Sequence, residues 1–578
     1  MHRAFVEIGQ RELASVRRRS RPLFWTVGLF SLFANLLMFT GPLYMLQIYD
    51  RVLGSGSIAT LIALSGLVVF MYGIMGVLDY ARGRIMARVG ARFHADLDRR
   101  VFDAVVRKSA VAPDVKTQSG LDDLEAVQRL LASPALLAGF DLPWMPIFFA
   151  GIFLFHPVLG ALAVAGGFLL FAIAIFSQAM SRNPQSEAST AGQEAAVIAD
   201  QMRIEAEVVQ AMGMRMAVFD HWQTARSTAC RAQLRAVDTT GAFSSVTRTL
   251  RMFLQSAMLG LGAYLVLQGE LSAGAMIAGS ILLGRALAPI EQVANQWPVV
   301  QRAVTAWANL SELLGAVAPE TRKTALPKPK ANLSAKSLTV VPPGQKHASI
   351  KAISFDVAPG QAVGVIGASG SGKTTLARAL TGVWPPAGGS LRLDGAAFDQ
   401  FDQTVLGQHI GYLPQRVQLF DGSIAQNIAR MIANPCDEKV VAAARAAAAH
   451  DMILGLPKGY DTMVSCGQVR LSGGQMQRIG LARALYDDPV ITVLDEPNSN
   501  LDNVGSEALN QAIRALKADG RSVLVMAHRP AAIQECDQLL VLNNGARMAF
   551  GPKDEVLAGM VKNHQQFQTP PSTQVAVA

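Results

Sequence analysis

The sequence contains few charged residues. Asp, Glu, Lys and Arg make up 16% of its 578 residues, whereas roughly 25% is usual in soluble globular proteins. Hydrophobic residues reach 51%. This is too little charge to cover the surface of an ordinary soluble protein of this length. The composition therefore favours a protein that membrane lipid surrounds over much of its surface.

The positive charge does not indicate a nucleic-acid-binding protein. The formal net charge is +9, and a basic chain can bind nucleic acid. However, no stretch interleaves basic and aromatic side chains as surfaces that stack bases do. The basic residues are concentrated before and between apolar segments instead. We therefore expect no nucleic-acid partner.

The cysteines are too few and too far apart to form a metal or redox motif. They are Cys230, Cys436, Cys466 and Cys536. A CxxC pair or a zinc-ligand spacing is absent, so we expect unpaired thiols in a reducing compartment. We also expect no cleavable signal peptide, because the first apolar segment is too long for one and lacks a convincing small-residue cleavage site.

Six apolar segments in the first half predict transmembrane helices. A hydrocarbon core about 30 Å thick needs about 20 apolar residues. The predicted spans are residues 23–46, 58–80, 135–155, 157–179, 250–268 and 271–290. Only His156-Pro157 separates the third span from the fourth, and only the turn around Gly269 separates the fifth from the sixth. Each of these two pairs therefore forms a tight hairpin.

The basic residues orient the predicted spans. Arginines dominate the tail of residues 1–21, and positive residues beside a first span remain in the cytoplasm. Six spans then place both termini, and the polar segments 81–133 and 181–245, in the cytoplasm. In the first segment, apolar residues recur every four positions, which is a helical period. They are Ile85, Val89, Phe93, Leu97, Val101 and Val105.

Each polar segment is long enough for two helices. Helices of about 25 residues going out and back would each project about 40 Å beyond the bilayer. We interpret them as extensions of the spans. The alternative is a set of soluble helices that fold separately.

The composition changes after the sixth span. We expect a transmembrane domain over residues 22–318 and a linker rich in proline and lysine over 319–333. Residues 334–562 alternate short β-branched strands with helical patterns, as in a parallel α/β domain. Residues 563–578 are polar without periodicity and are expected to be a disordered tail. The predicted fold is a polytopic α-helical membrane domain followed by an α/β P-loop nucleotide-binding domain.

A glycine-rich phosphate-binding motif directly follows the predicted strand 362–366. Glycine, four residues and Gly-Lys-Thr, between a strand and a helix, is the P-loop pattern. Its residues are Gly367, Ala368, Ser369, Gly370, Ser371, Gly372, Lys373, Thr374 and Thr375. Backbone N–H groups surround the phosphates of ATP, the lysine supplies positive charge to them, and the Thr374 hydroxyl can ligate Mg²⁺.

Two further strand ends carry residues suited to ATP hydrolysis. Asp495 and Glu496 follow the apolar strand 490–494. We expect Asp495 to hold Mg²⁺ and Glu496 to polarise the water that attacks the γ-phosphate. His528 follows the strand 523–526 and can hydrogen-bond the γ-phosphate. The alternatives are a solvated carboxylate pair and a structural histidine.

A second anion-binding helix start is predicted at Leu471-Ser-Gly-Gly-Gln475. One chain cannot easily fold this segment onto its own P-loop. Together these motifs resemble the ATP-binding cassette (ABC) family over about residues 334–560. The resemblance implies that Ser472, Gly473, Gly474 and Gln475 complete the ATP site of a second copy, which predicts a homodimer. It also implies that Gln415 senses Mg²⁺ and the membrane domain, and that Asp502 signals between the two sites.

The sequence departs from the usual family pattern at three positions. Val341 stands where an aromatic residue commonly stacks on adenine, which predicts weaker and less selective base binding. Cys466 stands where exporters often carry glutamate. Met476 replaces a common arginine. None of these changes removes a catalytic group.

The membrane half resembles the permease/ATPases of type I secretion systems. The residues that carry the resemblance are Thr40–Leu53, Phe140–Pro146, Glu207–Met214 and Gly284–Glu291. It implies an inner-membrane exporter of unfolded proteins with uncleaved C-terminal signals. It also implies a periplasmic adaptor (membrane fusion protein) and a TolC-like outer-membrane channel in a Gram-negative host. The alternatives are an exporter of lipid, lipopeptide or small molecules, and an ATP-gated channel or regulator.

Four ionisable residues in or beside the spans are candidates for the transport pathway, because such groups are costly in lipid. They are Asp79, Asp141, Arg285 and Glu291. The alternative is that each pairs within the helix bundle or lies at an interface. For coupling between the domains we nominate residues 112–125 and 208–220, and the family resemblance implies that short helices here dock near Gln415.

Overall fold

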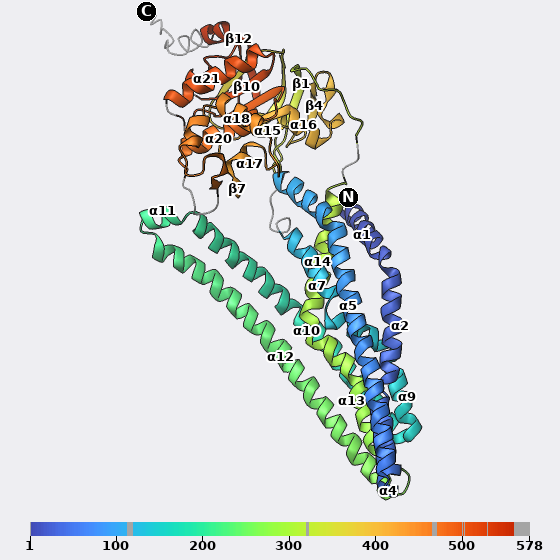
Figure 1. The fold of residues 1–578 in the computed structure, drawn as a ribbon. Coiled ribbons are helices and arrows are strands. Elements are labelled where there is room, and N and C mark those ends of the chain that lie inside the picture. The colour runs from blue at the N-terminus through green and yellow to red at the C-terminus, as the bar shows by residue number, and fades with distance from the viewer. Residues whose placement is uncertain are drawn as a thin grey trace, which may run out of the picture. The chain divides into compact units, whose positions relative to one another are not determined.

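The computed structural model describes residues 2–111, 119–319, 323–464, 471–499, 501, 503–528 and 530–559 (Figure 1). The chain divides into two compact units, one of residues 1–109 and 113–319 and the other of residues 110–112 and 320–578. The predicted polar tail 563–578, residues 112–118 of the nominated coupling segment, Cys466 and Asp502 lie outside the described residues.

The first unit contains six helical runs that are long and apolar enough to cross a bilayer, counted over the described residues. This confirms the six predicted spans. The runs are α2 (Arg21–Leu37) with α3 (Thr40–Gln47), η1 (Ile48–Val52) and α4 (Leu53–Ser55); α5 (Ile58–Val111); α8 (Pro134–Asp141) with η2 (Leu142–Trp144) and α9 (Met145–Phe155); α10 (Pro157–Ile204); α12 (Arg215–Leu267); and α13 (Ala273–Asn295).

Three of these helices are much longer than a bilayer is thick. The helices α5, α10 and α12 have 54, 48 and 53 residues, and 50 residues of helix span about 75 Å. The polar segments therefore continue the spans, as the four-residue period predicted. Side chains of α9, α10, α12 and α13 form a shared core around Phe148, Ile152 and Met258.

A second helical core lies at the polar end of α5. Here α1 (His2–Arg19), α7 (Gly120–Leu131) and α14 (Trp297–Ala316) pack with α5 around Leu13, Leu97, Leu124 and Leu310. The sequence analysis described residues 1–21 only as a tail. The tail is helical because Leu13 and Val16 lie three residues apart and both face this core.

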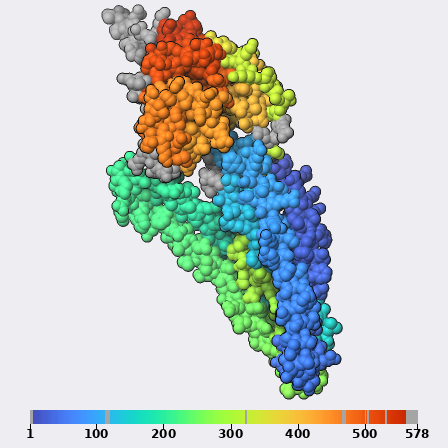
Figure 2. Space-filling view, in the orientation of Figure 1, coloured from blue at the N-terminus to red at the C-terminus, as the bar shows by residue number. Residues whose placement is uncertain are grey.

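The polar ends of α10 and α12 form a separate two-helix arm, defined here as residues 181–245, with the short helix α11 (Ala206–Ala211) at its tip. Figures 1 and 2 show the arm diverging from α5 toward that tip. Its buried core consists of alanines, namely Ala188, Ala232 and Ala236, with Ala191 packed against them.

The second unit contains a mostly parallel sheet with the strand order β12-β11-β3-β10-β9-β6. Only the edge strand β12 is antiparallel to its neighbour. This confirms the predicted α/β domain. The strands are β3 (Ala362–Gly367), β6 (Ile410–Leu413), β9 (Ile491–Asp495), β10 (Ser522–Ala527), β11 (Gln538–Asn543) and β12 (Ala546–Pro552).

Helices cover this sheet, and all residues of β9 and β10 are buried, as expected for strands covered on both faces. The helices include α15 (Lys373–Leu380), α16 (Gln403–His409), α17 (Ile424–Ile428), α18 (Asp437–Ala446), α19 (His450–Leu454), α20 (Gly473–Leu485) and α21 (Asn503–Ala518). The sequence analysis did not predict the antiparallel sheet β2-β1-β4-β5. Its strands are β1 (Leu333–Val340), β2 (Ile350–Val357), β4 (Gly388–Leu393) and β5 (Ala396–Ala397), and a separate small pair is formed by β7 (Gly422–Ser423) and β8 (Met463–Val464).

Candidate functional site

The candidate site lies at the carboxyl ends of three neighbouring parallel strands. β10 lies between β3 and β9. Ile366 pairs with Ala527 at the end of β10, and Asp495 pairs with Met526. The register therefore brings the glycine-rich loop after β3, the two carboxylates after β9 and His528 after β10 to one edge of the sheet.

The glycine-rich loop, residues 367–375, leads from β3 into α15. Gly370 and Gly372 have φ values of +78° and +102°, a region that residues with a Cβ rarely adopt. A Cβ at Gly372 would also lie 2.7 Å from the carbonyl oxygen of Ser349. Ala368, Ser369 and Gly370 are exposed at the crest of the loop. The N-terminus of α15 thus has its first N–H groups beside an open, positively polarised turn.

Lys373 closes the base of this loop. Its Nζ donates hydrogen bonds to the carbonyl oxygens of Gly367 (2.9 Å) and Ala368 (3.0 Å). Burial lowers the pKa of Lys373, and the nearby carboxylates of Glu496 and Asp495 oppose that shift. These two carbonyl oxygens hold the ammonium group close to the loop. An anionic ligand would bind the ammonium group more strongly than the neutral carbonyls do.

Asp495 is buried with no hydrogen-bond partner on its carboxylate. Its residue is 1% exposed, and both Oδ1 and Oδ2 lack a partner. Burial raises the pKa of Asp495, while Thr374, Arg378 and Lys373 oppose the rise. A buried carboxylate is costly unless a cation or donor satisfies it. The Asp495 oxygens beside the Thr374 hydroxyl are hard donors of the kind that Mg²⁺ prefers.

Glu496 is held between two side chains from other strand ends. Its Oε1 lies 2.6 Å from Nε2 of His528, and its Oε2 accepts a hydrogen bond of 3.0 Å from Nε2 of Gln415. Glu496 has a φ of +52°, which is an unfavourable region for a residue with a side chain. The structure therefore brings Gln415, Glu496 and His528 together, although they lie far apart in the sequence.

The predicted signature segment begins helix α20. The Ser472 Oγ accepts a hydrogen bond from the Gln475 N–H (3.2 Å), and the Gln475 Oε1 accepts one from the Ser472 N–H (2.8 Å). This is a capping box. Within the described part of the chain, no hydrogen bond or ion pair joins residues 472–475 to the glycine-rich loop of the same chain. Gly473 and Gly474 occupy the first turn of α20.

Gln477 is a site residue that the sequence motifs do not indicate. This residue is 1% exposed, and its Nε2 donates to the carbonyl oxygen of Pro497 (3.1 Å). It thereby ties α20 to the turn that follows Glu496. A glutamine on the otherwise apolar buried face of this helix was the available signal. Val341, the candidate for adenine contact, is half-buried directly after β1, and Asp502 lies outside the described residues.

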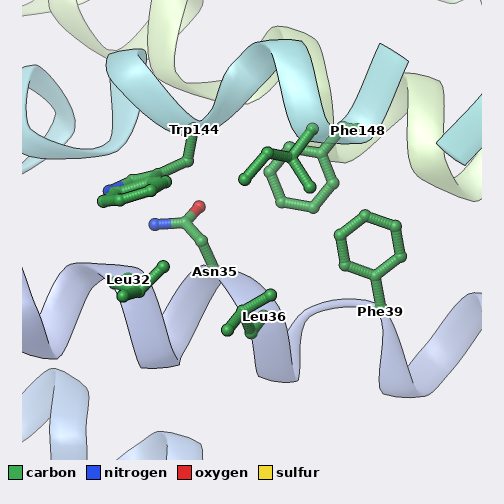
Figure 3. A pocket seen from close by; sticks show the side chains of 7 residues that line it. Leu32, Asn35, Leu36, Phe39, Trp144 and Phe148 are labelled. Carbon is green, nitrogen blue, oxygen red and sulfur yellow. The ribbon is translucent and has the colours of Figure 1, made fainter. Parts of the chain in front are cut away.

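Most of the ionisable candidates in the membrane unit pair within the helix bundle. Arg82 on α5 lies 2.6 Å from Oδ1 of Asp141 and 2.9 Å from Oδ1 of Asp79. Asn35 donates to the same Asp141 oxygen at 2.8 Å. Figure 3 shows Asn35 beside Trp144, in a pocket between α2 and the segment η2–α9.

The other two pathway candidates differ from each other. Glu291 pairs with Arg251 at 3.0 Å. Arg285 is exposed, and over the described residues it has no side-chain partner. Pairing within the bundle therefore accounts for three of the four candidates, and Arg285 remains.

Two sequence families match the chain. The ABC transporter transmembrane region matches residues 24–287, and the ABC transporter family matches residues 350–499. A bacterial Atm1-family ABC exporter, solved with ATP bound, has a TM-score of 0.78 and 21% identity; the match covers 96% of this chain and 99% of that chain. These findings define an ABC exporter with a membrane region and an ATPase domain.

Curated relatives refine this class. The type I secretion system ATP-binding protein PrsD of Rhizobium meliloti is 43% identical over 561 residues, which cover 96% of this chain and 95% of that protein. The leukotoxin translocation ATP-binding protein LktB of Mannheimia haemolytica is 27% identical, over 93% of this chain and 76% of that protein. The chain therefore belongs to the type I secretion ABC exporters and is an ATP-driven transporter. This confirms the resemblance found in the sequence.

Proposed function

We propose that this exporter works as a homodimer in the inner membrane of a bacterium and moves an unfolded protein with a C-terminal signal out of the cytoplasm. Both termini and the ATPase domain (residues 334–562) face the cytoplasm, and residues 22–318 form the transport domain. The observation that carries the proposal is the group Asp495, Glu496 and His528 assembled at the glycine-rich loop of a chain that is 43% identical to a type I secretion protein.

ATP binds with its phosphates on the glycine-rich loop. The backbone N–H groups of residues 368–375 and the start of α15 surround the β- and γ-phosphates, and Lys373 exchanges its two loop carbonyls for phosphate oxygens. Thr374, Asp495 and Gln415 would hold Mg²⁺, which neutralises phosphate charge when bound. Within the described residues no cluster of three His, Cys, Asp or Glu forms a metal site.

Glu496 acts on the water. It accepts the hydrogen bond of a water molecule whose oxygen attacks the γ-phosphorus, while the bond to the β–γ bridging oxygen breaks and ADP leaves with the electron pair. Gln415 and His528 fix the carboxylate from two sides. His528 can also donate to a γ-phosphate oxygen.

The second copy supplies the rest of the site. Residues 472–475 do not reach the glycine-rich loop of their own chain in the described structure, so we assign them, together with Asp502, to the ATP site of the partner. The arm also supports dimerisation, because it exposes large apolar side chains near its tip. These are Ile204 (75% exposed), Met212 (71%) and Met216 (70%).

Export requires further partners. Because the relatives are named for type I secretion and for leukotoxin translocation, we assign a secreted protein as the cargo. A periplasmic adaptor and a TolC-like channel would complete the path across the outer membrane. Closure of the two ATPase domains is transmitted through the tips of the long helices, near residues 112–125 and 208–220.

The test compares proteins in culture supernatants of wild-type, deletion and Glu496→Gln strains by quantitative mass spectrometry. The variant should bind ATP, lose nearly all turnover, and lose the same one or few signal-peptide-free proteins as the deletion. Normal secretion by Glu496→Gln would refute the mechanism. An unchanged protein profile in both mutants, with the transporter expressed, would favour a lipid or small-molecule cargo instead.

A further inference from the structure

The N-terminal helix α1 packs against the last turns of α14 so closely that the two backbones are in contact. Gly9 and Gly315 are both buried at this crossing. A Cβ at Gly9 would collide with the carbonyl oxygen of Ser311, and a Cβ at Gly315 would collide with that of Phe5. The two helices can approach this closely only because neither residue has a side chain.

Arg100 of α5 binds the same place from the other side. Its Nε donates to Oε1 of Glu12 on α1 at 2.9 Å. Its Nη2 donates to the carbonyl oxygen of Leu314 at 3.2 Å and also to that of Val317. The Leu314 carbonyl is one of the last of α14, which have no partner within the helix and carry its negative dipole end. Val317 is the residue directly after the helix. One guanidinium therefore joins α1, α5 and the end of α14.

This contact lies where the chain leaves the membrane unit. α14 ends at Ala316, and the proline- and lysine-rich linker to the ATPase domain begins within a few residues. Arg107 adds a hydrogen bond of 3.1 Å to the carbonyl oxygen of Ala318. Two arginines of α5 thus hold the backbone at the point where the chain leaves the membrane unit.

We propose that Arg100, oriented by Glu12, is a positioning residue for coupling. It fixes the end of α14 to α1 and α5, so that movement of the linker during the ATP cycle is transmitted to the transmembrane helices. Without this attachment the last turn of α14 unwinds when the linker is pulled, and ATP hydrolysis proceeds with little export. The inference extends the proposed function and concerns neither the ATP site nor the cargo path.

A charge swap separates this role from that of a simple ion pair. Arg100→Gln in the full-length dimer should leave ATP turnover within about two-fold of wild type. Amide hydrogen exchange at residues 314–319 should rise about ten-fold, and export per transporter should fall about ten-fold, as expected from the loss of charge-assisted hydrogen bonds. The double variant Glu12→Arg/Arg100→Glu restores an ion pair but places a carboxylate against the α14 carbonyls, so it should remain as defective. Recovery of export by the swap would overturn the proposal.

Matched glycine variants provide the second test. Gly9→Ala forces α1 away from α14 and should show the same separation of turnover from export. Gly83→Ala on α5, where a Cβ meets nothing within 4 Å, should behave as wild type. A parallel fall of turnover and export in Arg100→Gln and Gly9→Ala would show general damage and would also overturn the proposal. Hydrogen exchange at the end of α14 can be measured without any cargo. Failure of this proposal can therefore be distinguished from failure of the protein-export proposal.

Discussion

Replacing Asp495 by asparagine should stabilise the nucleotide-free protein while weakening its response to Mg²⁺ and ATP. The carboxylate is buried and neither oxygen has a hydrogen-bond partner, so its charge is poorly solvated. Burial raises the pKa of Asp495 above 3.8. The folded protein therefore binds this proton more tightly than the unfolded chain does. Stability consequently falls as the pH rises from the unfolded pKa through the raised folded one.

The size of this effect follows from the burial. An unsatisfied buried polar group costs about 1–3 kcal/mol. A change of 1 kcal/mol shifts the melting temperature of a domain of 150–250 residues by about 2–4 °C. We therefore expect Asp495→Asn to unfold about 2–12 °C higher than wild type at pH 7 in EDTA without nucleotide, and to lose this advantage below the unfolded pKa.

The assay is thermal unfolding of the detergent-solubilised protein in the Glu496→Gln background, which prevents turnover. With Mg²⁺ and ATP the order should invert, because a carboxylate binds the ion more strongly than the neutral amide of asparagine does. Asp356→Asn is the control, since Asp356 is exposed on β2 and its side chain has no hydrogen bond or ion pair within the described residues. An Asp495→Asn protein that melts at or below wild type in EDTA would refute the reasoning.

Three further outcomes follow from geometry described above. Gly372→Ala should reduce ATP affinity at least about ten-fold, because a left-handed residue with a Cβ costs about 1–2 kcal/mol and this Cβ would meet Ser349. Binding of a fluorescent ATP analogue measures the affinity, and an unchanged value would contradict this prediction. Asp141→Asn should lower membrane-unit stability by about 1–3 kcal/mol, since buried Arg82 then keeps only Asp79 as a charge partner. Thermal unfolding that matches wild type would count against the pairing. Burial raises the pKa of Cys536 to about 12. Maleimide should therefore label the exposed Cys230 in the folded protein but label Cys536 only after unfolding. Mass spectrometry of tryptic peptides would reveal which cysteine is labelled.

The features of the fold and site that can be predicted from sequence are those that depend on local sequence patterns. Apolar length specified the six spans because a bilayer sets a fixed requirement, and the four-residue period of Ile85, Val89 and Phe93 indicated that α5 continues beyond the membrane. The glycine-rich loop and the Asp495-Glu496 pair were also predictable, because each lies at the end of a strand with its own hydrophobic signature.

The rest depends on contacts between distant segments. Nothing local indicates that Gln415 and His528 both meet Glu496, because the strand order of the sheet decides this. The same applies to Gly9 and Gly315, which look like ordinary helix-weakening glycines until α1 and α14 are placed in contact. The antiparallel sheet was missed because its strands, such as β1 with its shifted register, lack a clean alternating pattern.

The alanine core of the arm has a consequence for quality control in the cell. A seam of Ala188, Ala232 and Ala236 buries little apolar surface, so it offsets only a small part of the entropy lost when two long helices are ordered. In the proposed homodimer, contacts with the second copy would add to this small core. If the homodimer proposed above forms, membrane proteases should cleave the arm faster in copies without a partner than in assembled copies.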